Sequence, residues 1–148
     1  MIIPNIVLSL NEIMFYFTRA ALGVGLPHGL AEDFGRSSVW LATNGLDPAA
    51  VTYDALINLD SKYSVISSTF NETVFNTILK SSDGKKLSSL LAGPCVCDWI
   101  LGKAKYCNHS YEYICENIDN PFLIIAAIAS VKKGIWEIRL QSKGHDLN

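Results

Sequence analysis

The N-terminal third of the chain carries three successive helix start signals, and these constrain the fold more than any other feature. Ser9 and Glu12 match a capping box, in which two side-chain oxygens accept hydrogen bonds from otherwise unpaired backbone N–H groups. The glycines of segment 23–29 interrupt that helix, and the proline within this segment suits the first turn of a second. Asp47 and Pro48 repeat the start signal. The sequence therefore predicts a bundle of three short helices.

Apolar residues at helical spacing support each of these helices. The expected inner faces are Leu10, Ile13, Met14, Phe17 and Ala21 in the first helix, Leu30, Phe34, Ser38 and Leu41 in the second, and Val51, Ala55 and Leu59 in the third. Gly45 is expected to end the second helix. Phe15, Tyr16, Phe17 and Trp40 lie on or beside these stripes, so we expect them in the core rather than around a ligand pocket.

The segment after the third helix gives a weaker pattern. Asn71 is a candidate cap for a helix whose apolar residues would be Val74, Phe75, Ile78 and Leu79. The Ser-Ser-Asp-Gly sequence at 81–84 then predicts an exposed turn and the internal boundary of the chain.

The remainder alternates between strand and helix patterns. We expect a strand over 87–91, a short helix beginning at Pro94, a strand over 111–118, a buried helix over 122–133 and a closing strand over 135–140. The predicted fold class is α+β, with the three-helix unit packed on a smaller part that contains two or three strands and a buried helix. We expect one domain over 1–148 that divides into a helical unit (1–80), an α/β part (85–142) and a loose tail (143–148).

The composition leaves a surplus of apolar residues. Of the 148 residues 49% are hydrophobic and only 18% are charged, which is apolar for a single domain of this size. An oligomeric or partner interface would cover the surplus, and the alternative is a monomer with an unusually apolar surface. The lysines occur as scattered pairs rather than as one basic face, which disfavours nucleic-acid binding. The apolar run 122–131 is too short to cross a bilayer and the N-terminus lacks a basic leader, so we expect a cytoplasmic protein with no membrane segment.

A row of ionisable residues marks the start of the second helix. His28, Glu32 and Arg36 are spaced by four, so they share one helix face, with Asp33 beside them. This face could supply a proton carrier, its carboxylate partner and a cation for a small carboxylate ligand. The alternative is that these residues form ordinary ion pairs on an exposed helix surface, with no role in binding or catalysis. The neighbouring glycines do not match a phosphate loop, because no strand precedes them and the proline removes a donor.

Cysteines form the other candidate cluster. Cys95, Cys97, Cys107 and His109 contain enough soft ligands for a metal ion, and Cys115 follows. Their spacings match no established zinc motif, and small buried thiols explain most such cysteines, so we predict neither a metal nor another cofactor. A thiolate at Cys97 or Cys107, activated by His109 or Lys105, is the corresponding catalytic alternative.

A family resemblance lies in the N-terminal third. The Ser-Leu-Asn-Glu opening at 9–12, the segment Gly-Val-Gly-Leu-Pro-His-Gly-Leu-Ala-Glu-Asp at 23–33 and Trp-Leu-Ala at 40–42 resemble an uncharacterised bacterial family, domain of unknown function 3726, mainly over residues 8–46. In that family an aromatic residue takes the place of His28 and a second glutamate that of Asp33, so the resemblance does not imply that either side chain is required. The resemblance implies a bacterial origin and no reaction.

Two functions follow from these features. The first is a cytoplasmic accessory or assembly protein that acts through an apolar homo-oligomer or partner interface. The second is a small enzyme or carboxylate-binding protein that uses the face of His28, Glu32 and Arg36.

Overall fold

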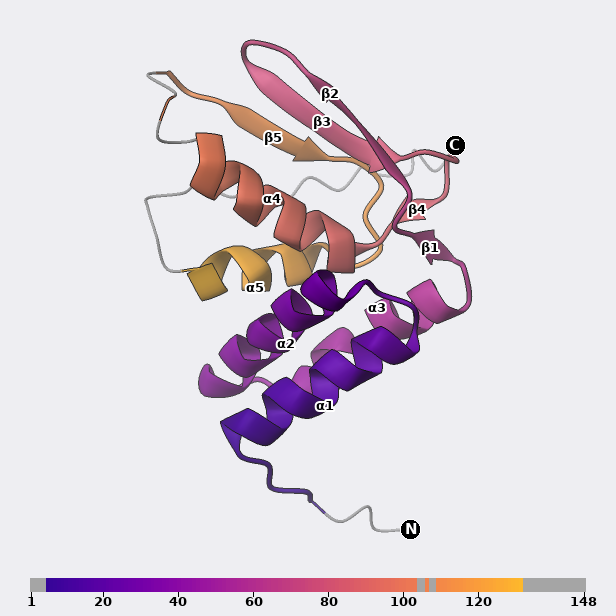
Figure 1. Cartoon of the computed structure of the whole chain (residues 1–148), viewed down its shortest axis with the longest axis vertical. Coiled ribbons are helices and arrows are strands. Elements are labelled where there is room, and N and C mark those ends of the chain that lie inside the picture. The colour runs from indigo at the N-terminus through magenta and orange to yellow at the C-terminus, as the bar shows by residue number, and fades with distance from the viewer. Residues whose placement is uncertain (1–4, 104–105, 107–108, 132–148) are drawn as a thin grey trace, which may run out of the picture.

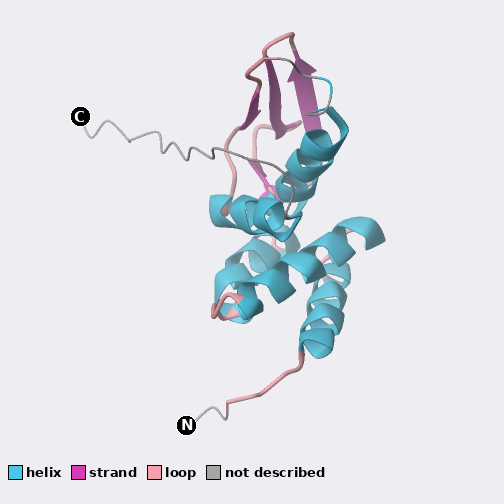
Figure 2. Cartoon of the chain, turned by 90° about the vertical axis from the view of Figure 1, so that its left-hand side faces the viewer, coloured by secondary structure: helices cyan, strands magenta, loops and turns pink. Residues whose placement is uncertain are grey.

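The computed structural model describes residues 5–103, 106 and 109–131 of the chain, and these form two layers. Three helices make up one end of the molecule, and the strands with two further helices make up the other (Figures 1 and 2). The elements of the first layer are α1 (Leu10–Gly23), α2 (His28–Thr43) and α3 (Pro48–Asp60). The predicted three-helix unit and the α+β class are confirmed.

The predicted helix starts are set by local hydrogen bonds. Ser9 Oγ accepts from the Glu12 backbone N–H at 3.3 Å, and the Ser9 N–H donates to the Glu12 carboxylate at 2.8 Å, so the capping box is complete. These bonds hold the pKa of Glu12 below its usual value. At α3, Asp47 Oδ1 accepts from the Ala49 N–H at 2.9 Å, with Pro48 in the first helical position. Each cap satisfies a donor that its helix leaves unpaired.

The connection between α1 and α2 is a tight turn. Gly25 has φ +90°, a conformation that side chains with a Cβ rarely adopt, and it lets the chain reverse after α1. Pro27 is the N-cap of α2, so the helix begins one residue later than predicted. Gly45 follows α2 with φ +76°, as expected for a residue that ends a helix.

Helix α2 lies at the centre, where it contacts α1, α3 and both helices of the second layer. Its inner residues Phe34 and Leu41 are buried, and the Phe34 ring lies 6.0 Å from that of Phe17. Phe15 and Tyr16 remain 54% and 52% exposed, so the expectation that they are core residues was wrong.

The second layer contains a small sheet and two helices. Its helices are α4 (Ser89–Lys103) and α5 (Pro121–Val131), and its three-stranded sheet has the order β2 (Ser68–Glu72), β3 (Asn76–Ser81), β5 (Glu112–Cys115). Strands β2 and β3 are antiparallel, whereas β3 and β5 are parallel and are connected through α4. A short parallel pair, β1 (Ser64–Val65) and β4 (Lys86–Leu87), joins the two layers. The predicted strand at 111–118 and the buried helix after 121 are confirmed.

The helix expected after Asn71 was wrong, because this segment is the β2–β3 hairpin. The Thr73 hydroxyl accepts from the backbone N–H groups of Phe75 and Asn76, which folds the chain into a tight turn. Along β3 the alternate residues Thr77 and Leu79 are each 3% exposed, so burial follows the two-residue period of a strand.

The strand expected over 87–91 was wrong beyond Leu87, and Pro94 lies inside α4 instead of starting a helix. The start of α4 is fixed by a distant residue: Asp119 Oδ1 accepts from the Ser89 N–H at 2.9 Å. Pro94 costs this helix one backbone hydrogen bond. Packing offsets that loss, since a Cβ on the neighbouring Gly93 would lie 2.9 Å from Ala127 Cβ, which shows how closely α5 approaches.

The predicted turn at 81–84 is confirmed, with Gly84 at φ +76°. The strand expected over 135–140 and the tail over 143–148 lie outside the described residues. Within the part of the chain that the structure describes, no helix is both long enough and apolar enough to cross a membrane.

Candidate functional site

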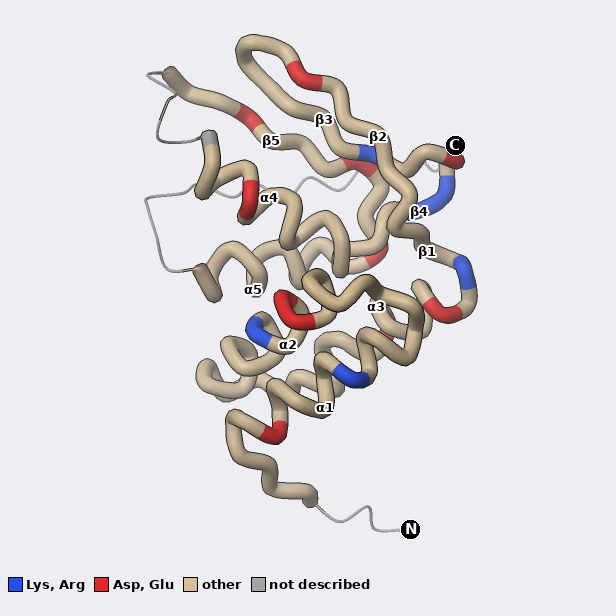
Figure 3. The backbone as a smooth tube through the Cα atoms, in the orientation of Figure 1, with Lys and Arg blue, Asp and Glu red and all other residues tan. Residues whose placement is uncertain are grey.

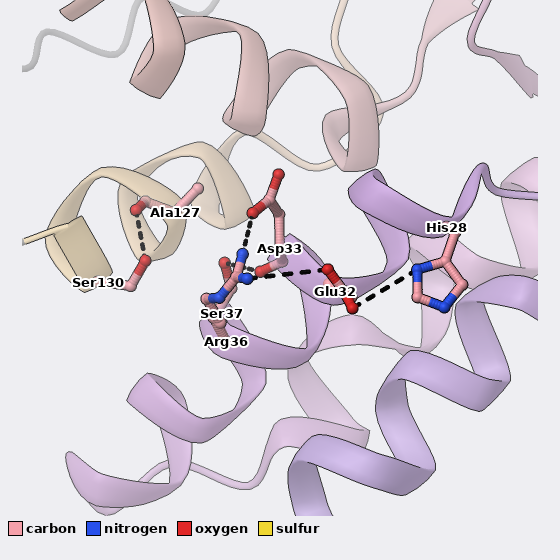
Figure 4. A network of polar contacts seen from close by, with 7 residues as sticks. All are labelled: His28, Glu32, Asp33, Arg36, Ser37, Ala127 and Ser130. Atoms are coloured by element: carbon pink, nitrogen blue, oxygen red, sulfur yellow. Dashed lines mark hydrogen bonds and ion pairs between the residues drawn. The ribbon is translucent and has the colours of Figure 1, made fainter. Parts of the chain in front are cut away.

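The structure brings the predicted ionisable residues of α2 together. His28 Nδ1 lies 3.5 Å from Glu32 Oε1, and Glu32 Oε2 lies 3.9 Å from Arg36 Nη2, so Glu32 stands between the other two (Figure 4). Arg36 also donates to Asp33. The spacing of four residues therefore predicted the contacts of Glu32 correctly. The second carboxylate that contacts Arg36 is that of Asp33, three positions earlier in the helix.

The electrostatics of this cluster disfavour an anionic ligand. Arg36 already faces two carboxylates, so with a neutral imidazole the cluster carries a net negative charge. Burial raises the pKa of Asp33, with a further contribution from the nearby Asp98, while Arg36 opposes the shift. The side chains of His28, Glu32 and Arg36 are 73%, 42% and 58% exposed. Exposed ion pairs of this kind contribute at most about 1 kcal/mol to folding.

The cysteines resemble buried apolar residues more than reactive groups. Cys95 and Cys97 lie in α4 and Cys115 in β5, and all three are free thiols. Burial raises the pKa of Cys97 to about 11, with Asp98 adding to it, and that of Cys115 to about 12. Such thiols stay protonated at neutral pH, whereas catalysis and metal binding require the thiolate.

His109 contacts the hairpin rather than a cysteine. Its Nε2 lies 3.0 Å from the Val74 carbonyl oxygen, and its ring lies 5.9 Å from that of Phe75. Among the described residues, no three His, Cys, Asp or Glu side chains are grouped closely enough to hold a metal ion. Cys107 and Lys105 lie outside the described residues, so the metal cluster and the thiolate alternative that include them stay untested as a whole.

An apolar groove lies between α1 and α3. Its volume is about 250 Å³, and neither wall contributes a charged side chain. The residues that line this α1/α3 groove are Tyr16, Phe17 and Ala20 from α1 and Ala49, Thr52, Tyr53 and Leu56 from α3. The Thr52 hydroxyl donates to the Pro48 carbonyl at 2.8 Å, so its hydrogen is already used within α3. The groove is therefore suited to apolar surface.

The geometry of the helices explains why the groove stays open. Helix α2 packs along α1 extensively but along α3 more sparsely, which leaves room between the two outer helices. Tyr53 of α3 is 62% exposed, and Tyr16 of α1 is 52% exposed. Sequence reasoning missed the groove, although a second apolar stripe of α3 at spacings of four and three, Ala49, Tyr53 and Leu56, was a usable signal.

A second, smaller cavity lies beneath α2. Its volume is about 10 Å³, the space of a single water molecule. It is lined by Phe34, Ser37, Ser89, Leu90, Pro94, Leu123 and Ala127. Neither this cavity nor the groove includes His28, Glu32 or Arg36.

Comparison with known proteins gives a match to one family model. Residues 8–64 match the model of a family described as protein of unknown function (DUF3726). This segment holds the whole three-helix unit and therefore both walls of the α1/α3 groove, and it extends past the resemblance seen over residues 8–46. No curated protein and no solved structure matches the chain.

Proposed function

We propose that this protein is a non-catalytic accessory protein that binds an amphipathic helix of a protein partner in the α1/α3 groove. The observation that carries the proposal is a concave surface of about 250 Å³ walled by Tyr16, Tyr53 and other uncharged side chains. Exposed apolar concavities of this kind mark interaction sites, because water contact with them is unfavourable. The excess of apolar residues in the composition is consistent with such a role.

A helix fits the groove better than a small molecule does. Small-molecule sites place a few polar groups that orient the ligand, and they occupy about 300–1,000 Å³. Here the volume is smaller, and the Thr52 hydroxyl donates within its own helix. The walls from α1 and α3 instead form a trough in which the apolar residues of a third helix, at positions i, i+3, i+4 and i+7, can pack.

The charges of the two helices that form the groove indicate the polar face of the partner. Helices α1 and α3 together contain three acidic residues, Glu12, Asp54 and Asp60, and one basic residue, Arg19 (Figure 3). The Arg19 guanidinium lies over the Phe15 ring at 5.1 Å. A partner helix with lysines or arginines beside its apolar stripe is therefore favoured, because opposite charges across an interface speed association and align it.

The free thiols support a cytoplasmic setting for this function. Cys95, Cys97 and Cys115 form no disulfide with one another, as is usual for cysteines in a reducing compartment.

The proposal is tested with a model ligand of the expected chemistry. A fluorescent peptide of leucine and lysine, arranged as an amphipathic helix of about five turns, is titrated with the full chain while its anisotropy is measured. A peptide of the same composition with scrambled order serves as the ligand control. We expect the ordered peptide to bind and the scrambled one to bind at least about tenfold more weakly, since only the former presents one apolar face.

Two protein variants locate the binding. Tyr53→Glu places a charge in the groove wall, and Tyr63→Glu is the matched control, because Tyr63 is similarly exposed but does not line the groove. We expect the first to weaken peptide binding at least about tenfold and the second to leave it unchanged, with far-ultraviolet circular dichroism showing that both fold. Equal losses in the two variants, or equal binding of the two peptides, would refute the proposal.

A further inference from the structure

The small cavity beneath α2 lies where helices of the two layers meet. Its walls come from α2, α4 and α5, and every residue that lines it is buried. None of these residues is charged, and the volume is about 10 Å³. The cavity therefore fits one small neutral molecule.

The first polar group of this cavity is the Ser89 hydroxyl. Ser89 is the first residue of α4 and is 1% exposed. Its backbone N–H donates to Asp119 Oδ1 at 2.9 Å, but its side-chain oxygen has no hydrogen-bond partner among the described residues. A buried hydroxyl without a partner costs free energy, so an ordered water is the usual partner for such a group.

Pro94 adds a second polar group to the same cavity. In an α-helix the N–H of residue 94 would donate to the Leu90 carbonyl, four positions earlier. Proline has no N–H, so this carbonyl loses its helical donor, and the proline ring pushes it aside. Leu90 and Pro94 both line the cavity, so the interruption of α4 lies beside Ser89.

Ser37 of α2 supplies the third polar group. Its hydroxyl donates to the Asp33 carbonyl at 3.1 Å, so its hydrogen is already used within α2. The oxygen of a serine hydroxyl also has two lone pairs that accept hydrogen bonds. Ser37 therefore presents an acceptor to the cavity from the side opposite α4.

We infer that this cavity binds one water molecule that connects α2 to α4. The Ser89 hydroxyl donates to the water oxygen, and the water donates one hydrogen to the Leu90 carbonyl and the other to the Ser37 oxygen. Three hydrogen bonds are typical of a buried water. Since Ser37 belongs to the three-helix unit and Ser89 to the second layer, the water joins the two layers.

The polar groups select water over an ion. A small metal cation requires about six oxygen ligands, several of them usually charged, whereas the cavity offers two acceptors and no carboxylate. An anion requires several donors, and Ser89 supplies one. The cavity and the α1/α3 groove share no lining residue, so this inference does not rest on the proposed function.

A crystal structure of the full chain, at a resolution that shows buried water, tests the site directly. We expect one density peak in the cavity, within about 3.2 Å of Ser89 Oγ, the Leu90 carbonyl oxygen and Ser37 Oγ. A cavity without such a peak, in a crystal that shows other buried waters, would overturn the inference.

A matched pair of serine variants tests the same hydrogen bonds in solution. Ser89→Ala removes the donor to the water and should lower the melting temperature by about 2–4 °C, the shift for one net hydrogen bond in a chain of this size. Ser64→Ala is the control, because the Ser64 hydroxyl is also fully buried without a partner among the described residues but does not line the cavity.

The two variants should differ in the sign or size of their effect. Removing an unbonded buried hydroxyl relieves a cost, so Ser64→Ala should leave the melting temperature unchanged or raise it. Far-ultraviolet circular dichroism would show that both variants keep the helical content of the wild type. Equal melting temperatures for Ser89→Ala and Ser64→Ala would show that no water bonds to Ser89.

Discussion

Replacing Gly35 with alanine tests the contact on which the position of α1 depends. A Cβ built on Gly35 would overlap Thr18 Oγ1, and it would lie 2.8 Å from Met14 Sδ and 3.1 Å from the Met14 carbonyl oxygen, all in α1. The methionine sulfur can move aside, but the carbonyl is backbone and the Thr18 hydroxyl is buried without a hydrogen-bond partner. The added methyl group therefore separates the two helices.

The expected magnitude is the balance of two effects. Overpacking a tight contact costs about 1–3 kcal/mol. Alanine in place of glycine in a helix interior returns up to about 1 kcal/mol. We expect Gly35→Ala to lower the free energy of unfolding by about 0–3 kcal/mol in net terms. Because the propensity gain obscures the clash, the informative quantity is the difference from a second glycine of the same helix.

Gly29 supplies that control, because a Cβ there would meet no atom within 4 Å. Gly29→Ala should be neutral or slightly stabilising, so the two variants should differ by about 1–3 kcal/mol in urea unfolding followed by circular dichroism. Gly35→Ala should also alter binding of the leucine–lysine peptide, since the shift of α1 changes the width of the groove. If Gly35→Ala unfolds at the same urea concentration as Gly29→Ala, the close approach of α1 and α2 is not as described.

Two further predictions concern the charged cluster. For Asp33, burial raises the carboxyl pKa in the folded protein above its unfolded value, so folding stability should decrease as pH rises from the unfolded pKa through the folded one. In Asp33→Asn this decrease should disappear from thermal unfolding curves measured between about pH 3 and 6. An unchanged pH profile would contradict the raised pKa of Asp33. Arg36 is paired with two carboxylates, which leaves its guanidinium little attraction for a further anion. A thermal-shift screen of small carboxylates should therefore give equal responses for the wild type and Arg36→Ala. A carboxylate that stabilises only the wild type would support the carboxylate-binding alternative.

The parts of the fold that sequence predicted correctly are those fixed by neighbouring residues. The Ser9–Glu12 box and the Asp47 cap each close a hydrogen bond within three positions, so the residue types alone identify them. The start of α4 depends instead on Asp119, thirty positions away from Ser89. No local pattern contains that partner, and Pro94 in the same segment is the stronger local signal for a later start.

The hairpin was missed because its apolar residues satisfy two periods at once. Val74, Phe75, Ile78 and Leu79 fit one face of a helix, but Val74 and Phe75 belong to the turn and only Leu79 enters the core. The decisive residue is Thr73, whose hydroxyl accepts from two backbone N–H groups and closes the turn. Threonine commonly makes such bonds, but its presence alone does not select a turn over a helix.

The candidate sites also differ in whether neighbouring or distant residues determine them. The contact of His28 with Glu32 and of Glu32 with Arg36 follows from helical spacing and was predictable. The α1/α3 groove is a tertiary feature, since its walls come from helices about thirty residues apart and its opening depends on how each packs on α2. Sequence could indicate that apolar surface was in excess, but not where the excess would lie.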